Sequence, residues 1–235
     1  MTATVALVLA YLSIGLKPIH LKNEAVYNKK AIISAIAEHL EVDFAKITDD
    51  EVQGVFDNQI EQIVVNMDGE ILNEDQVAQS GYPGGLAEHV DMAKERKKPL
   101  EEQILPVFVY TKSSGEKYYI LSIRGNGLWD EIWGNIALED DLNTIAGVAF
   151  DHKQETPGLG AEIKDNPAWK AQFTGEQIND EDGNFVSVDI VKGAADAEDI
   201  HAVDGITGAT ITADGVGEML ERGLQYYRPY LDNLN

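Results

Sequence analysis

The segment that decides the fold begins with ILPVFVYT at Ile104–Thr111 and continues with KYYILSIRG at Lys117–Gly125. Both stretches are rich in β-branched and aromatic residues, which favour strands. Between them, Ser113–Gly115 (SSG) is typical of a tight turn. We therefore expect the two stretches to pair as an antiparallel hairpin.

A second pair of strands is predicted directly after the first. GLWDEIWGNIAL covers Gly127–Leu138 and LNTIAGVAFDH covers Leu142–His152, with Asp140-Asp141 at the turn. Asp182-Gly183 then predicts a turn into another strand, FVSVDIVKG at Phe185–Gly193. From that strand we expect a loop that runs to Thr210.

Helices are predicted on both sides of these strands. Asn166-Pro167 is a favourable N-cap and first helical residue, and opens a helix through Phe173. A closing helix is expected over about Ala213–Leu231. Upstream, apolar residues at helical spacing over Leu21–Leu40 predict an amphipathic helix. The expected class is α+β, with helices packed on an antiparallel sheet.

Two shorter elements are predicted before the first hairpin. Asp49-Asp50 offers a helix start, with Val52, Val55 and Phe56 on one face, and Ile60–Met67 reads as a short strand. We divide the chain into residues 1–18 as a membrane anchor, 19–100 as a helical entry segment with the start of the soluble domain, and 101–235 as the α+β domain.

The composition excludes several classes of function. The 235 residues contain no cysteine, so a disulfide, a thiolate nucleophile, a cysteine-ligated iron–sulfur cluster and a zinc finger are ruled out. Redox work would need an organic cofactor. The net charge is −23, and the longest basic run is Lys94, Arg96, Lys97 and Lys98, so nucleic acid is not an expected partner. The acidic surplus favours solubility.

No metal site is predicted. The five histidines are scattered without ligand spacing. The segment Asp180–Asn184 has the composition of a calcium loop, but lacks the terminal glutamate at the required spacing, so we interpret it as a turn.

The first residues are apolar. Thr2–Leu16 carries no charge, and as a helix it spans roughly 22 Å, less than the ~30 Å of a hydrocarbon core. It could be a signal-peptide core, a buried helix, or a membrane helix whose first turns precede this sequence, and we favour the last. Lysines follow the segment, which leaves its orientation open.

One glycine-rich stretch carries the strongest chemical signal. Asp204–Thr212 reads DGITGATIT and leads into the closing helix. Gly205 and Gly208 let the backbone approach a ligand closely, and Ala209 adds almost no bulk. Three hydroxyls accompany the helix start: Thr207, Thr210 and Thr212. A helix N-terminus favours phosphate, although a glycine-rich turn with threonine caps explains the same pattern.

A second glycine-rich loop, ETPGLG, covers Glu155–Gly160. Pro157 rigidifies this loop, and its glycines expose backbone groups that can hydrogen-bond the edge of a planar heterocycle; a simple connector is the alternative. Gly127–Trp129 and Trp133 supply flat apolar surface, which in most proteins belongs to the core.

The segments GLWDEIWG, LNTIAGVAFDHKQETPGLGAEI, NPAWKAQF and DGITGATIT occur in this order, with LKP at Leu16–Pro18 near the start. In this the chain resembles the C subunit of the bacterial sodium-translocating NADH:quinone reductase. DGITGATIT alone is similar to the wider family of covalent-flavin domains, which includes the G subunit of the ferredoxin-linked ion pump. The GLW…IWG and DLNTIAGVAF segments favour the quinone-reductase branch.

The resemblance implies a covalent cofactor. The family pattern is S/T-G-A-T, and its last threonine, here Thr210, bears flavin mononucleotide (FMN) through a phosphoester. Thr207 stands where many relatives have serine, which keeps the hydroxyl. A magnesium-dependent flavin transferase that splits FAD is implied for maturation. Other subunits of a membrane complex, one membrane helix in the bacterial inner membrane and an extracytoplasmic soluble domain are implied as well.

Further contacts with FMN are expected around Thr210. The expected cofactor-binding residues are Thr207, Gly208, Ala209, Thr210, Thr212, Glu155, Thr156, Gly158, Leu159, Trp129 and Lys192. We expect the loop at Glu155–Leu159 to contact the isoalloxazine ring. Thr212 could give the phosphate a second hydroxyl. Lys192 could stabilise negative charge on the flavin, pair with the phosphate, or be a plain surface lysine.

The leading hypothesis is an electron-transfer subunit, and no catalytic residue is predicted. The alternatives are the G-type flavin subunit and a non-redox, membrane-anchored binding or scaffold domain. The isolated chain is not expected to oxidise NADH, because no G-x-G-x-x-G opens a βαβ unit.

Overall fold

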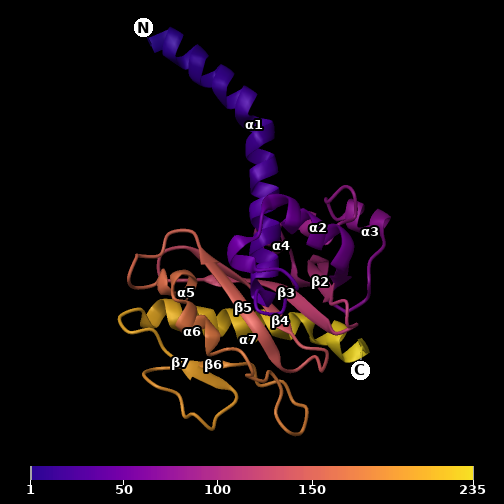
Figure 1. The fold of residues 1–235 in the computed structure, drawn as a ribbon, viewed down its shortest axis with the longest axis vertical. Helices are drawn as coiled ribbons and strands as arrows, with labels where there is room; N and C mark the ends of the chain where they lie inside the picture. Colours follow the sequence, from indigo (N-terminus) through magenta and orange to yellow (C-terminus); the bar gives the residue numbers. More distant parts are fainter. Residues whose placement is uncertain (1, 235) are drawn as a thin grey trace.

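The structure, a computed structural model, describes residues 2–234 and is built around one antiparallel sheet (Figure 1). Its five strands follow each other in the order of the chain. They are β1 (Ile60–Asn66), β2 (Ile104–Thr111), β3 (Lys117–Asn126), β4 (Glu131–Leu138) and β5 (Ile145–His152). The predicted α+β class, an antiparallel sheet with packed helices, is confirmed.

The hairpin between β2 and β3 forms as its sequence predicts. Gly115 has φ 93° and donates its N–H to Lys112 O at 2.9 Å, which closes the turn. The next hairpin differs from the prediction, because β4 begins at Glu131 and not at Gly127. Gly127 N donates to Asp130 O at 2.8 Å, so residues 127–130 form a turn that ends β3.

Each face of the sheet is covered by helices. The long helix α7 (Thr210–Leu234) packs along β3 on one face, where Gly223 sits so close that an added Cβ would lie 2.6 Å from Ile123 Cγ2. The other face carries the end of α1 (Thr2–Ile33), the short helix η1 (Ser34–Ile36) and α2 (Asp49–Gln59). The sheet therefore lies between two apolar cores.

The predicted helix start at Asp49 is confirmed. Thr48 is the N-cap, and its hydroxyl and the Glu51 carboxylate form a reciprocal capping box. Val52, Val55 and Phe56 are buried on one face of this helix, as their spacing predicts. The remaining short helices are η2 (Phe44–Lys46), α3 (Glu74–Gln79), η3 (Ala87–His89), α4 (Met92–Glu95), η4 (Leu100–Glu102), α5 (Glu162–Asp165) and α6 (Pro167–Ala171).

The strand predicted over Phe185–Gly193 is largely wrong. Only β6 (Asp189–Val191) forms, and it pairs in parallel with β7 (Ala202–Asp204), outside the main sheet. The chain bends before β6 because Ser187 has φ 65°, and the N–H groups of Val186 and Ser187 both donate to Ile178 O. The expected loop up to Thr210 therefore contains a strand that the sequence analysis missed.

Two helix boundaries also differ from the predictions. α7 starts at Thr210, three residues earlier than expected, because Ala213 N already bonds to Ala209 O. The apolar segment and the amphipathic segment near the N-terminus form one continuous helix, α1, which ends at Ile33. The expected end at Leu40 is wrong, since Ser34–Ile36 tightens into a 3-10 turn.

The first part of α1 projects from the body of the protein as a rod (Figure 1). Most of the large apolar side chains described there are exposed, including Leu9, Tyr11 and Ile14. Among residues 2–234, no helix combines the length and the apolar character that crossing a membrane requires.

The lower part of α1 is fixed to the sheet by a polar contact. Tyr27 Oη donates to Asp151 Oδ2 at 2.5 Å, and Lys164 Nζ lies 2.9 Å from Asp151 Oδ1. Burial favours the neutral acid, but the hydrogen bonds from Tyr27 and Lys164 outweigh it, so the pKa of Asp151 lies below its ordinary value of 3.8. The ionised carboxylate thus joins α1, β5 and α5.

Replacing Asp151 tests this junction. We expect Asp151→Asn to lower the free energy of unfolding by about 1–2 kcal/mol at pH 7, because hydrogen bonds to a charged group are lost. Because the pKa of Asp151 is lower in the folded than in the unfolded protein, its ionised carboxylate stabilises the fold above the unfolded pKa. This contribution disappears as the pH falls below 4 through the folded pKa. Urea unfolding of both proteins across this range should show the difference shrinking.

The matched control is Asp140→Asn, which changes an exposed aspartate in the turn between β4 and β5. We expect a change within about 0.5 kcal/mol. Equal destabilisation by both variants, or a difference that stays constant down to pH 2, would contradict the proposed role of Asp151.

Candidate functional site

A pocket of about 290 Å³ lies between the two-stranded sheet and the first turn of α7. Its lining includes Thr207, Gly208 and Thr210 of the DGITGATIT segment, together with Lys192 and Asp214. Three segments that are separate in the sequence, 190–193, 205–208 and the start of α7, therefore meet at one opening. The structure brings Lys192 to Thr210, a proximity that their spacing in the sequence does not reveal.

The segment that leads into the pocket is held by the backbone and side chain of Asp204. Its N–H donates to Gln172 Oε1 at 3.0 Å, and its carbonyl accepts from Trp169 Nε1 at 2.7 Å. Its carboxylate accepts from Ala195 N at 2.8 Å. Because both hydrogen-bonding groups of its backbone and its side chain are engaged, Asp204 fixes where the glycine-rich turn begins.

Two glycines allow the turn that follows. A Cβ on Gly205 would lie 2.6 Å from Val191 O, so only glycine lets this backbone pass close to β6. Gly208 has φ +80°, and a Cβ there would lie 2.9 Å from Leu159 Cδ2. The second contact places the Glu155–Gly160 loop directly against the T-G-A-T turn.

The first turn of α7 begins at this pocket, with Thr210 in its lining. The first helical bond joins Ala213 N to Ala209 O, so the amides of Thr210, Ile211 and Thr212 have no carbonyl four residues earlier within the helix. Thr210 is exposed and is the first helical residue. The helix dipole and these amides favour an anion such as phosphate at this position.

The charges around the pocket are mixed. Lys192 and Asp214 both line it, and both side chains are exposed. The lysine would support a bound phosphate, and the aspartate would oppose it. Asp214 follows Thr210 by four residues, which puts both on the same side of the helix. The sequence analysis missed Asp214, although this spacing could have revealed it.

Thr212 does not line the pocket. Its side chain is 1% exposed, and Oγ1 donates to Glu155 Oε2 at 2.7 Å. Trp129 N donates to the other oxygen, Glu155 Oε1, at 3.0 Å. The carboxylate therefore connects the turn after β3, the Glu155–Gly160 loop and α7, while the hydroxyl of Thr212 is used within the protein.

Glycines make room for this buried carboxylate. A Cβ on Gly160 would lie 2.2 Å from Glu155 Oε2, and a Cβ on Gly127 would lie 2.4 Å from Oε1. Gly215 adds a third close approach, because its Cβ would lie 2.2 Å from Asn126 O. These contacts set how closely α7 approaches the turn after β3.

Exposed apolar side chains surround the same junction. Trp129 is 66% exposed and Leu159 is 42% exposed, and both belong to segments that Glu155 joins. Leu128 and Ile211 are exposed beside them, and neither was predicted as a site residue. The alternative interpretation of Trp129 as a core residue is wrong. Trp133 lies elsewhere, packed beneath Arg124.

The remaining predicted residues lie in two turns. Thr156 and Gly158 are exposed, and Thr156 O accepts from Leu159 N and Ala161 N at 3.1 Å, which closes the loop. Gly158 adopts φ +74° within it. Ala209 is buried, and its N–H donates to Ile206 O at 3.1 Å. These residues shape the loops on which Leu159 and Thr210 stand.

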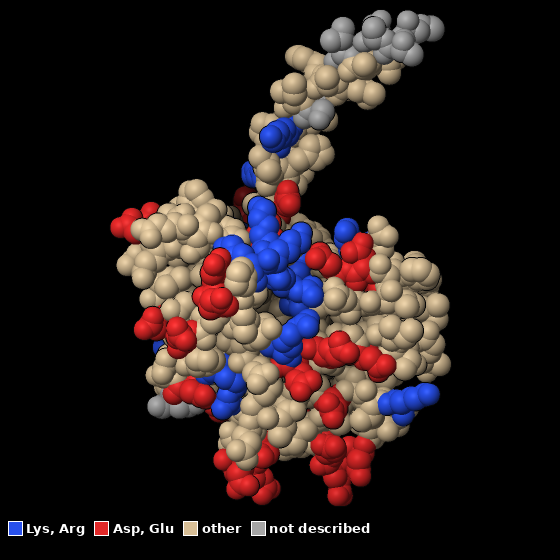
Figure 2. Space-filling model, turned by 180° about the vertical axis from the view of Figure 1, so that it is seen from behind, with Lys and Arg blue, Asp and Glu red and all other residues tan. Residues whose placement is uncertain are grey.

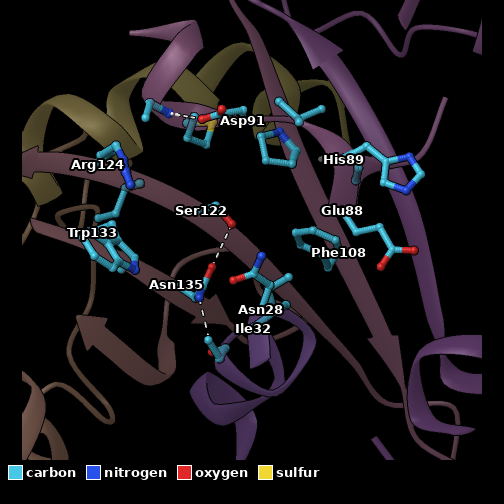
Figure 3. Close-up of a pocket in the computed structure, with 18 of the residues that line it drawn as sticks. Asn28, Ile32, Glu88, His89, Asp91, Phe108, Ser122, Arg124, Trp133 and Asn135 are labelled. Atoms are coloured by element: carbon cyan, nitrogen blue, oxygen red, sulfur yellow. Dashed lines mark hydrogen bonds between the residues drawn. The ribbon is translucent and has the colours of Figure 1, made fainter. Parts of the chain in front are cut away.

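A larger cavity of about 440 Å³ lies elsewhere, between the end of α1, residues 87–93 and the sheet (Figure 3). Asn28, Glu88, Ser122 and Asn135 surround it, and none of the predicted site residues lines it. The smaller pocket beside Thr210 is therefore the candidate site, because the predicted residues Thr207, Gly208, Thr210 and Lys192 converge there.

Comparison with known families and proteins gives one consistent answer. A family model described as "FMN-binding domain" matches residues 127–225, a range that includes Glu155, Lys192 and Thr210. The C subunit of the Na⁺-translocating NADH-quinone reductase of Pseudomonas aeruginosa is 34% identical over 236 residues, covering 94% of this chain and 87% of that protein. The corresponding subunit of Yersinia pestis is 31% identical, covering 90% and 80%.

Two solved structures share the fold. The crystal structure of the C subunit of the Na⁺-translocating NADH-quinone reductase from Parabacteroides distasonis superposes with a TM-score of 0.76 at 34% identity, covering 92% of this chain and 96% of that one. NqrC of Shewanella oneidensis gives a TM-score of 0.74 at 24% identity, covering 90% and 98%, and supports the fold alone. By sequence and by fold, the chain belongs to the family of C subunits of the Na⁺-translocating NADH-quinone reductase.

Proposed function

We propose that this chain is the electron-transfer flavoprotein subunit of a Na⁺-translocating NADH:quinone reductase, with FMN linked by a phosphoester to Thr210. The observation that carries the proposal is the position of Thr210, an exposed hydroxyl on the first residue of α7 that lines a pocket inside the matched FMN-binding region. When bound, FMN supplies the redox chemistry, and the protein supplies binding and orientation.

The residues at the pocket fit the phosphate end of FMN. Gly205 and Gly208 leave space where side chains would collide with Val191 or Leu159. The free amides of the first turn of α7 and the Lys192 ammonium offer donors and positive charge. In a chain with a net charge of −23, this local compensation allows an anionic group to stay bound.

The surface next to the pocket fits an aromatic ring. Leu159 touches the T-G-A-T turn at Gly208, and Trp129 belongs to the neighbouring turn that Glu155 holds. An exposed apolar patch of this kind marks a binding surface. We propose that the isoalloxazine ring lies along these side chains, with the backbone groups of Thr156–Leu159 at its edge.

Glu155 and Thr212 then act as positioning residues. Their hydrogen bond fixes the Glu155–Gly160 loop relative to the start of α7. It therefore sets the position of Leu159, at the proposed ring surface, relative to Thr210, the proposed attachment point. The hydroxyl of Thr212 donates its hydrogen bond to Glu155. Thr210 and Thr207 are therefore the threonines whose hydroxyls are at the pocket.

Attachment requires a flavin transferase. In the proposed step, Thr210 Oγ1 attacks the FMN phosphorus of FAD, the phosphoanhydride bond breaks, AMP leaves, and the hydroxyl proton is released. The exposure of Thr210 gives such an enzyme access. We further propose that the chain assembles with other subunits, that residues 1–18 belong to a single membrane anchor in the bacterial inner membrane, and that the soluble part lies on the extracytoplasmic side.

The attachment site can be tested by mass spectrometry. After coexpression with a flavin transferase, we expect the peptide that contains Thr210 to gain the mass of one FMN less one water. Thr210→Ala should lose this increment, because the acceptor oxygen is gone. The matched control Thr207→Ala changes an exposed hydroxyl of the same pocket and should keep the flavin.

The variant Thr212→Val tests whether Thr212 is needed for flavin attachment or only for the stability of the fold. This variant should keep covalent flavin but lose about 1–3 kcal/mol of unfolding free energy, because Glu155 Oε2 loses its buried donor. Covalent flavin in Thr210→Ala would refute the assignment. A colourless wild-type protein after coexpression would instead favour the scaffold hypothesis.

The ring surface is tested by a second pair of variants in the flavinylated protein. We expect Leu159→Ala and Thr156→Ala to shift the reduction potential or the visible absorption of the flavin, because both alter the surroundings of the ring. Leu100→Ala, which changes a similarly exposed leucine in η4, should change neither. Spectra and potentials identical to wild type in both loop variants would place the ring elsewhere.

A further inference from the structure

A third pocket, of about 160 Å³, lies between α4, the end of β3 and the middle of α7. The chain has only four arginines, and three of them line this pocket: Arg96, Arg124 and Arg222. Its lining, all within residues 2–234, contains no Asp or Glu, although the chain holds 41 acidic residues against 18 basic ones. Composition alone does not predict such a gathering of positive charge.

Arg124 is incompletely compensated. Its guanidinium stacks on Trp133 at 4.7 Å from the ring centroid, and Figure 3 shows the two side chains together at the edge of the neighbouring cavity. Nη1 lies 3.6 Å from Glu131 Oε2, which is too far for a hydrogen bond. Nε and Nη1 are buried and find no hydrogen-bond partner among the described residues. Buried donors without a partner call for an explanation, and an anion in the adjoining pocket supplies one.

Arg96 and Arg222 increase the positive charge. Arg96 Nη1 donates to Gly125 O at 3.0 Å, a neutral acceptor. The ion pairs of arginine among residues 2–234 are Arg124 with Glu131 and Arg228 with Asp232, so Arg96 and Arg222 have no carboxylate oxygen within 4.0 Å. Burial lowers the pKa of Arg96, and so does the positive charge of Arg222, while the negative charge of Glu131 opposes the further lowering by Arg124. Arg222 and Arg124 therefore repel Arg96, and Glu131 offsets part of this repulsion.

The rest of the wall is mixed, with the neutral polar side chains of Gln103 and Ser122 beside apolar residues. Leu105 and Ile123 are buried apolar residues. Tyr227 Oη lies within hydrogen-bond distance of Pro106 O and Ser122 O, at 2.9 and 2.8 Å, so it is engaged with the backbone. A small pocket that has three guanidinium groups and no carboxylate in its lining suits a compact oxyanion.

We propose that Arg96, Arg124 and Arg222 bind an oxyanion of the phosphate class. A phosphate offers up to two negative charges and several acceptor oxygens, whereas a carboxylate offers one charge and two oxygens, so phosphate compensates three guanidinium groups better. The site is distinct from the Thr210 pocket, because the two share no lining residue. Figure 2 shows that basic side chains gather in a band on one face of the molecule.

The phosphate group can come from two sources, namely free phosphate or the headgroup of an anionic phospholipid. The first arm of the test titrates inorganic phosphate into the full chain by calorimetry at low ionic strength. We expect one saturable site at the arginines, weakened at least tenfold in Arg222→Gln and in Arg96→Gln. Arg228→Gln, the matched control, changes the fourth arginine, which pairs with Asp232, and should bind like wild type.

The second arm compares cosedimentation with vesicles of phosphatidylcholine alone and with vesicles that also contain phosphatidylglycerol. If the source is a lipid headgroup, the phosphatidylglycerol-dependent binding should fall in Arg222→Gln and persist in Arg228→Gln. The contribution of the apolar part of α1 is the same in all variants, so it cancels. Thermal melting of each variant checks that it is folded.

Three outcomes would overturn the proposal. Arg222→Gln could match wild type in both arms, or Arg228→Gln could lose as much binding as Arg222→Gln, which would indicate a diffuse charge effect. Lys192→Gln could abolish phosphate binding while Arg222→Gln leaves it intact, which would place the anion beside Thr210. Loss of binding in Arg222→Gln but not in Arg228→Gln, in either arm, supports the proposal and identifies the source.

Discussion

The candidate site depends on one buried carboxylate. Glu155 accepts hydrogen bonds from Thr212 Oγ1 and from Trp129 N, and thereby joins the start of α7 to the turn after β3. A buried carboxylate without donors costs several kcal/mol, so the three segments are stable in this position only together. Gly127 and Gly160 are required because a side chain at either position would displace the carboxylate. The relation between the apolar surface and the Thr210 pocket follows from this contact.

The end of β3 contributes to both the Glu155 junction and the arginine pocket. The turn after β3 donates to Glu155, and Arg124 of β3 lines the pocket. Pro106 cannot donate a backbone hydrogen bond, so the pairing of β2 with β3 stops at Val107 and Leu121. The hydroxyl of Tyr227, from α7, reaches Pro106 O and Ser122 O where the ladder ends. Beyond this point β3 continues without β2, and α4 contacts β3. Arg124 therefore has space around it that a fully paired strand would have filled.

Local patterns predicted the sheet well, because each hairpin is specified by its own strands and turn, as at Ser113–Gly115. They failed where the chain pairs with distant segments. The parallel pairing of β6 with β7 depends on contacts of Asp204 with Trp169 and Gln172, which no local spacing reveals. At the site, the sequence singled out Thr210 and, separately, Lys192, and both line one pocket. The contact of Thr212 could not be predicted, since its partner Glu155 is 57 residues away.

The two pockets proposed to bind anions offer positive charge in different ways within an acidic chain. Beside Thr210 the donors are backbone amides of a helix N-terminus with one exposed lysine, and Asp214 limits the net charge there. The covalent bond proposed at Thr210 would hold the anion there without strong electrostatic attraction. Between α4 and α7 the donors are three guanidinium groups without a carboxylate in the lining. Their mutual repulsion favours an exchangeable anion, because binding relieves it without any bond to the protein.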